Sequence, residues 1–163
     1  MQHQQTAIHQ FVKDLQVVIN QPIWRVIHPA DGWLFLDLGK RYQDYISDET
    51  GSEEPYPKGV YQLYIKGNWQ VIRSKAVIES RTVKPSESQE DYFLRMEAVA
   101  TNFPIRSISR VNQGDKTIIF NAGDGYRLEV NITEPDDSLR LTVVRVNKLN
   151  KPVSYRHFGY SQT

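Results

Sequence analysis

Asp37 is the residue whose setting most suggests chemistry, because its carboxylate interrupts an otherwise apolar stretch from Trp33 to Leu38. A near-continuous apolar stretch is typical of a strand that is buried on both faces. A carboxylate there either faces out of a sheet edge or pairs with a cation, and Arg25 in the preceding stretch is the candidate. We favour this structural ion pair over a second hypothesis, in which Arg25, His28 and Asp37 line a ligand pocket.

The composition excludes several classes of catalyst. The chain has no cysteine, so it can form no disulfide, thiolate nucleophile, Cys-based zinc site or iron–sulfur cluster. It contains neither a Gly-x-Ser-x-Gly elbow nor a phosphate-binding loop. The four histidines show no metal-ligand spacing: His3, His9, His28 and His157. We therefore expect no catalytic residue, no metal site and no cofactor.

A long polar segment, 40–58, carries the strongest signal for partner binding. It is acidic, rich in tyrosine and closed by Pro55 and Pro57, and its length predicts an inserted loop. Tyrosine is enriched at interfaces, and acidic side chains attract a basic partner. The competing interpretation is a mobile loop whose charges only solubilise the chain. The predicted contact residues are Tyr42, Asp44, Tyr45, Asp48, Glu49, Glu53, Glu54 and Tyr56.

The overall charge argues against a nucleic-acid partner. Lys and Arg number 20 and Asp and Glu 19, which gives a net charge of +1, whereas nucleic-acid binders usually carry a basic excess. One local group of cations beside aromatic residues is the alternative stacking platform. Its members are Lys66, Arg73, Lys75, Arg81 and Lys84, with Tyr64 and Trp69 nearby.

Nothing in the sequence indicates a membrane or an export route. The segment from Met1 to Gln10 lacks the basic and apolar regions of a secretory signal. No apolar stretch reaches the roughly 18 residues that a membrane-spanning helix needs. We expect a cytoplasmic protein.

Polarity patterns predict the elements that position these residues. Apolar residues at helical spacing predict one helix from Thr6 to Asn20 and another from Ser86 or Ser88 to about Asn102. The other stretches alternate in polarity and are joined by turns too short for parallel crossovers. The fold class is therefore α+β, with antiparallel β-meanders and two helices in one compact unit, 1–163.

The two halves of the chain share an order of elements: helix, proline, strand, turn, meander. Phe11 lies eleven residues before Pro22, and Phe93 lies eleven residues before Pro104. Each proline sits just after its predicted helix, with one residue between. This spacing favours a tandem duplication of a helix and an antiparallel sheet, since one such unit alone buries little surface.

A second similarity lies in the meanders, where a Tyr-x-Leu-x-Ile/Val pattern occurs at 61–65 and again at 126–130. The repeats would be 6–80 and 86–157, with 40–58 inserted in the first. The rival interpretation is that tyrosine, leucine and valine simply suit any strand.

The C-terminal third contains Ile105-Arg106-Ser107-Ile108, Thr117-Ile118-Ile119-Phe120 and Gly125-Tyr126-Arg127-Leu128-Glu129-Val130. This series resembles small uncharacterised bacterial proteins, including immunity-type proteins of toxin systems. The resemblance implies a non-enzymatic, partner-binding protein and brings no catalytic residues with it. The chain departs from the pattern in being neutral, where many immunity proteins are strongly acidic.

These observations predict a non-catalytic, immunity-like bacterial protein that binds an unknown protein partner. The alternative is a small-molecule-binding or enzymatic domain with a pocket between the two halves. A homo-oligomer stays open as well, because exposed edges of meanders pair readily with other strands.

Overall fold

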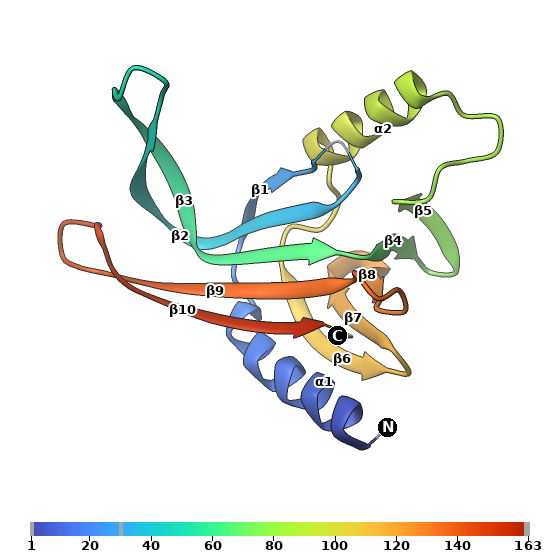
Figure 1. Cartoon of the computed structure of the whole chain (residues 1–163). Helices are drawn as coiled ribbons and strands as arrows, with labels where there is room; N and C mark the ends of the chain where they lie inside the picture. Colours follow the sequence, from blue (N-terminus) through green and yellow to red (C-terminus); the bar gives the residue numbers. More distant parts are fainter. Residues whose placement is uncertain (1, 30, 162–163) are drawn as a thin grey trace.

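The computed structural model describes residues 2–29 and 31–161, and within them two α-helices and ten strands form an α+β fold (Figure 1). All strand pairs of the two sheets are antiparallel, which confirms the predicted fold class. Sheet 1 contains, in spatial order, β1 (Ile23–Ile27), β2 (Leu34–Ser47), β3 (Glu53–Lys66), β9 (Ser138–Val146) and β10 (Pro152–Ser161). Sheet 2 contains β5 (Ala76–Ser80), β4 (Asn68–Arg73), β8 (Tyr126–Asn131), β7 (Thr117–Ala122) and β6 (Ile108–Gly114).

Helix α1 (Gln2–Asp14) begins before the predicted start at Thr6 and gives way to a 3₁₀ turn, Leu15–Val18. One face of this segment is buried, as the helical spacing of its apolar residues predicts. The buried residues are Ile8, Phe11, Val12, Leu15 and Val18.

Helix α2 (Gln89–Thr101) begins at Ser88, whose hydroxyl accepts a 3.0 Å hydrogen bond from the backbone N–H of Asp91. Of the two candidate caps, Ser88 is therefore the one used. Another short 3₁₀ turn, Gly123–Gly125, links β7 to β8. Among the described residues, no helix is long and apolar enough to cross a membrane.

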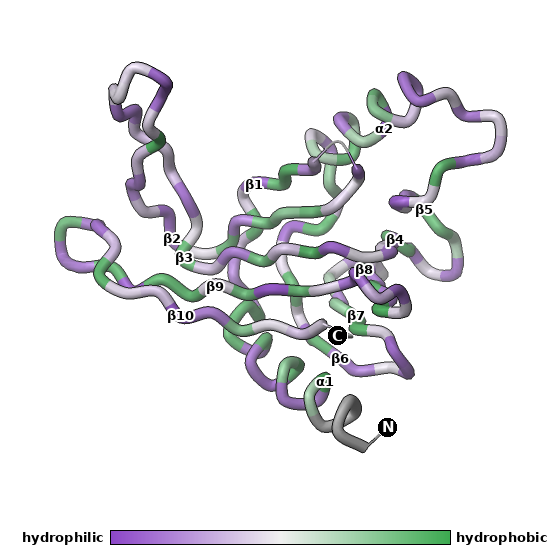
Figure 2. The backbone as a smooth tube through the Cα atoms, viewed as in Figure 1, coloured by the Kyte–Doolittle hydropathy of each residue, from purple (hydrophilic) through white to green (hydrophobic). Residues whose placement is uncertain are grey.

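The segment 40–58 is not a loop, which corrects the prediction. It is the outer part of the β2–β3 hairpin, whose ladder continues to the pair Ser47–Glu53. This part, called the arm here, projects away from the rest of the fold (Figure 1). Its tip is mostly hydrophilic (Figure 2).

The arm leaves the sheet at a kink between two glycines. The register of β2 against β3 shifts between Leu38 and Arg41, and Gly39 within this bulge has a φ of +78°, which favours glycine. Opposite it, a Cβ on Gly59 would come within 2.7 Å of the backbone nitrogen and oxygen of Leu38. The two strands therefore approach so closely here that only glycine fits on β3.

Each half of the chain contributes strands to both sheets. The first half runs α1, β1 to β5, and the second runs α2, β6 to β10. Strands β1, β2 and β3 are completed by β9 and β10 of the second half, and β6, β7 and β8 by β4 and β5 of the first. The sheets thus correspond strand by strand, with the last two strands of each half exchanged.

The strand registers correspond as well. The central strand of each sheet, β3 or β8, carries a leucine that is paired in register with two residues. One of them lies on the preceding strand of the same half, and the other lies on an exchanged strand. The two matching triplets are Leu36–Leu63–Leu141 in sheet 1 and Phe120–Leu128–Val71 in sheet 2. All six side chains are buried in one core cluster that both sheets and both helices share.

Trp69 connects this core to the β1–β2 loop. Its side chain is 1% exposed, and its indole N–H donates a 2.6 Å hydrogen bond to the carbonyl of Gly32. The proposed stacking role for Trp69 is therefore wrong, because the ring packs inside the molecule and no ligand can reach it.

Candidate functional site

The predicted pair of Arg25 and Asp37 exists and is structural. Asp37 is fully buried, and one carboxylate oxygen accepts a 2.7 Å hydrogen bond from Nε of Arg25. The other oxygen accepts a 2.8 Å bond from the backbone N–H of Gly59, and a terminal nitrogen of Arg25 donates to the carbonyl of Pro57 at 2.7 Å. Both charged groups are thus engaged in joining β1 and β2 to the base of the arm.

Aromatic rings stack on the same guanidinium. The central carbon of Arg25 lies 4.4 Å from the ring centroid of Tyr56 and 4.8 Å from that of Trp24. Arg41 lies 4.3 Å over the Trp24 ring as well. Tyr56 is consequently half-buried in this stack.

His28 lies apart from that pair. Its Nδ1 is 3.3 Å from the carbonyl of Pro29, and its ring meets Phe93 of α2 edge-on at 6.2 Å. It lines a shallow cavity of about 330 Å³ between β1 and α2, whereas Arg25 lines a neighbouring one of about 200 Å³. Asp37 lines neither, so the three predicted pocket residues do not converge on one cavity.

Besides Tyr56, three of the predicted contact residues in the arm have structural roles: Tyr42, Asp44 and Asp48. Tyr42 is 1% exposed, its hydroxyl accepts a 3.0 Å hydrogen bond from the Gln62 amide, and burial raises its pKa to about 12. The ammonium of Lys58 lies 2.9 Å from the carboxylate of Asp44 and lowers the pKa of that group.

Asp48 caps the turn at the tip of the arm. Its carboxylate accepts hydrogen bonds from the backbone N–H groups of Thr50 and Ser52 and from the Thr50 hydroxyl, at 2.8, 2.9 and 2.6 Å. The bond from that hydroxyl is the main reason why the pKa of Asp48 is lowered. Asp48 therefore holds the turn in shape.

The remaining predicted residues do form an exposed surface on the arm. Tyr45 is 50% exposed, and its neighbour Ile46 is 49% exposed. The carboxylates of three exposed glutamates form no ion pair with any cation of the described residues: Glu49, Glu53 and Glu54. The register puts Ile46 opposite Glu54, so an apolar side chain and an acid lie together.

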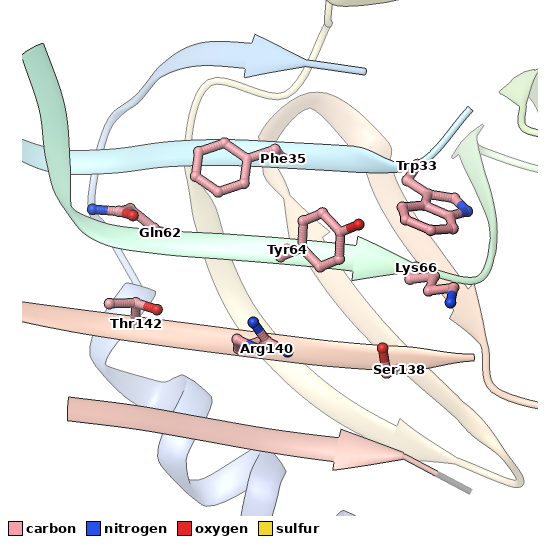
Figure 3. Close-up of a pocket in the computed structure, with 8 residues that line it drawn as sticks. All are labelled: Trp33, Phe35, Gln62, Tyr64, Lys66, Ser138, Arg140 and Thr142. Atoms are coloured by element: carbon pink, nitrogen blue, oxygen red, sulfur yellow. The ribbon is translucent and has the colours of Figure 1, made fainter. Parts of the chain in front are cut away.

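A second surface, which the sequence did not predict as a whole, is a shallow groove of about 460 Å³ on the outer face of sheet 1. Its side chains come from three adjacent strands and lie on the side of the sheet that faces away from the core (Figure 3). They are Trp33, which directly precedes β2, Phe35 from β2, Gln62, Tyr64 and Lys66 from β3, and Ser138, Arg140 and Thr142 from β9.

Aromatic rings form a row across this groove. The Tyr64 ring meets Trp33 edge-on at 5.8 Å and Phe35 at 6.4 Å between centroids. Partial burial raises the pKa of the Tyr64 hydroxyl. The continuous apolar stretch of β2 predicts burial on both faces, but Trp33 and Phe35 are only half-buried and no other described element covers them. The signal that could have revealed the groove is that the outward positions are aromatic, whereas the inward ones are leucine.

No family model matches the chain, and no curated protein or solved structure is significantly similar to it.

Proposed function

We propose that this is a bacterial, cytoplasmic protein without catalytic activity, which binds a protein partner as immunity-type proteins do. The arm is the element that contacts the partner. The observation that carries this proposal is the set of unpaired glutamates beside exposed Tyr45 and Ile46 on a projecting hairpin. Unpaired acids attract a basic surface, and apolar side chains next to them gain stability when a partner covers them.

The structural residues of the arm support this assignment. Asp48 fixes the turn, and the Asp44–Lys58 pair joins the two strands. The arm is thereby held in one shape before a partner arrives, which reduces the entropy lost on binding. The surface is thus a preformed hairpin rather than a segment that must fold on its partner.

We also infer that the chain arose by tandem duplication. The support is the exchange of strands between the halves together with the matching registers of β3 and β8. The arm has no counterpart in the second half, where β7 and β8 are joined by a short 3₁₀ turn. A feature added to one copy is a natural place for a binding function.

The test is cross-linking of the tagged protein in its bacterial extract, followed by identification of the captured protein and direct binding measurements with it. The variant is the triple replacement of Glu49, Glu53 and Glu54 by Gln. The matched control replaces two exposed acids of the β8–β9 turn, Glu134→Gln and Asp136→Asn.

The wild type and the control should bind the captured protein equally, and the arm variant should lose at least tenfold in affinity, chiefly at low salt. All three should unfold at the same temperature, since none of the replaced acids of the arm is paired. Equal binding by the arm variant would exclude the arm as the contact surface.

A further inference from the structure

The correspondence of the two sheets gives every position on the outer face of sheet 1 a counterpart on sheet 2. On sheet 2, Glu129 of β8 is paired in register with Ile119 and Gln70. Its carboxylate accepts a 2.8 Å hydrogen bond from Nε of Arg127 and a 3.3 Å bond from the amide of Gln70. The polar groups of this face therefore neutralise one another.

On sheet 1 the position of that carboxylate is occupied by an aromatic ring. Tyr64 of β3 is paired in register with Phe35 and Arg140, just as Glu129 of β8 is paired with Ile119 and Gln70. The acid that neutralises sheet 2 has no equivalent here. Arg140 is exposed, and its side chain forms no hydrogen bond or ion pair with the described residues.

A second cation lies at the far end of the groove. The ammonium of Lys66 is 4.6 Å from the Trp33 ring centroid, and among the described residues no carboxylate pairs with it. Its counterpart on sheet 2 is Asn131, which accepts a 2.9 Å hydrogen bond from Thr117. The outer face of sheet 1 thus combines a row of rings with two cations that form no ion pair among the described residues, and the acid whose charge acts on the groove is Asp31, which adds to the effect of burial in raising the pKa of Tyr64.

We propose that this groove binds single-stranded nucleic acid. Bases stack on the aromatic row of Trp33, Phe35 and Tyr64, and phosphates lie at the two cations, Lys66 and Arg140 (Figure 3). Hydroxyl and amide groups of Ser138, Thr142 and Gln62 line the same groove. The site is separate from the arm, so it adds to the proposed function and does not depend on it.

The choice of ligand follows from the combination of groups. An acidic peptide would pair with the two cations, but its carboxylates would make no stacking contact with the three rings. Each base of a nucleic acid, in contrast, has a flat face that stacks on a ring. Duplex nucleic acid would leave the rings unused, because its bases are already stacked on one another. The net charge of +1 is the sum over this cationic face and the acidic arm. For that reason the charge of the whole chain argues against a nucleic-acid partner although this one face is cationic.

The experiment measures fluorescence anisotropy of a labelled single-stranded oligo(dT) of about ten nucleotides, a length within the usual site sizes, over a range of salt concentrations. Two neutralised phosphates predict a slope of log affinity against log salt of about −1.4. Lys66→Gln and Arg140→Gln should each make this slope shallower, from about −1.4 to about −0.7. The replacement Tyr64→Glu, which copies sheet 2, should abolish binding.

The stacking contribution is tested separately. Phe35→Leu should lower the affinity about tenfold and leave the salt slope unchanged. Matched controls are Arg110→Gln on β6 and Phe93→Leu on α2, which remove an exposed cation and an exposed ring elsewhere. Both controls should bind as the wild type does, and thermal unfolding of every variant verifies its fold.

Three results would overturn the proposal. One is the absence of saturable oligonucleotide binding by the folded wild type. Another is equally tight binding of duplex DNA, or of a polyglutamate peptide that depends on the same side chains. The third is self-association that Arg140→Gln and the triple arm variant both abolish, because a second copy's arm would then occupy the groove. The arm variant should leave oligonucleotide binding unchanged, so the two proposals can fail independently.

Discussion

Arg25 and Asp37 are partners both in the backbone register of β1 and β2 and through a 2.7 Å hydrogen bond between their side chains. Asp37 also accepts a hydrogen bond from the backbone N–H of Gly59, the residue at which the arm leaves sheet 1. One buried carboxylate therefore ties the edge strand, the second strand and the start of the arm together.

Replacing Asp37 by Ala should lower the free energy of unfolding by about 3 kcal/mol, because the guanidinium of Arg25 and the N–H of Gly59 both lose their acceptor. The double variant Arg25→Met with Asp37→Leu should recover much of this loss. Urea unfolding measures both, with Asp44→Ala as a control that costs less than about 1 kcal/mol, since its pair is near the surface. A loss below about 1 kcal/mol for Asp37→Ala would contradict the structural role.

Gly59→Ala should destabilise the protein by about 2 kcal/mol, because the added Cβ meets the backbone of Leu38 rather than a movable side chain. The matched control is Gly123→Ala, where a Cβ has nothing within 4 Å. Thermal unfolding of the two variants provides the comparison. Equal melting temperatures for the two variants would show that the strands are not so tightly apposed.

Acid should weaken the attachment of α2. Arg95 donates hydrogen bonds to Glu87 and Glu79 at 2.8 and 2.7 Å, and its bond to Glu87 lowers the pKa of that carboxyl from 4.5 to about 2. A carboxyl whose pKa is depressed in the folded state stabilises the fold above its unfolded pKa. This stabilisation should therefore disappear as the pH falls from about 4.5 to about 2.

The measurement is urea unfolding of the wild type and Glu87→Gln at a series of pH values. The wild type should be the more stable at pH 7, and the difference should vanish near pH 2. A difference that does not change with pH would mean that the charge of Glu87 is not what matters.

The exchange of strands predicts that neither half folds alone. Residues 1–81 lack β9 and β10, so Leu63 of β3 would have no neighbour on one side; 82–163 lack β4 and β5 in the same way. Each half should give the circular dichroism of an unfolded or aggregated chain. When co-expressed, the halves should assemble with the spectrum of the whole protein. Native-like folding of one isolated half would disprove this interdependence.

Alternation of polarity was sufficient to predict most strands and the ion pair, because a carboxylate in an apolar stretch restricts the possible partners. It failed in the arm, where Tyr42 is the one buried apolar side chain and the other described residues are exposed or half-buried. Pro55 and Pro57 favoured a loop, yet both lie on β3 before it meets β9 at Tyr61. A proline there removes no ladder hydrogen bond on the open side of the strand.

The binding surfaces were harder to predict than the elements. Tyr42 and Tyr45 lie three residues apart in the same polar segment, but one is buried and the other exposed, because side chains three positions apart on a strand face opposite sides of the hairpin. The groove combines β2 and β3 with β9, and local sequence does not specify which distant strand completes a sheet.

The exchanged strands also affect how the chain folds as it leaves the ribosome. Strand β3 ends at Lys66, but its neighbour β9 begins only at Ser138, roughly seventy residues later. At 5–20 residues per second, an edge rich in apolar side chains waits about 4 to 14 s for its cover. During that interval the nascent chain presents an unpaired strand to any other chain nearby, and a chaperone that shields it would raise the yield of native protein.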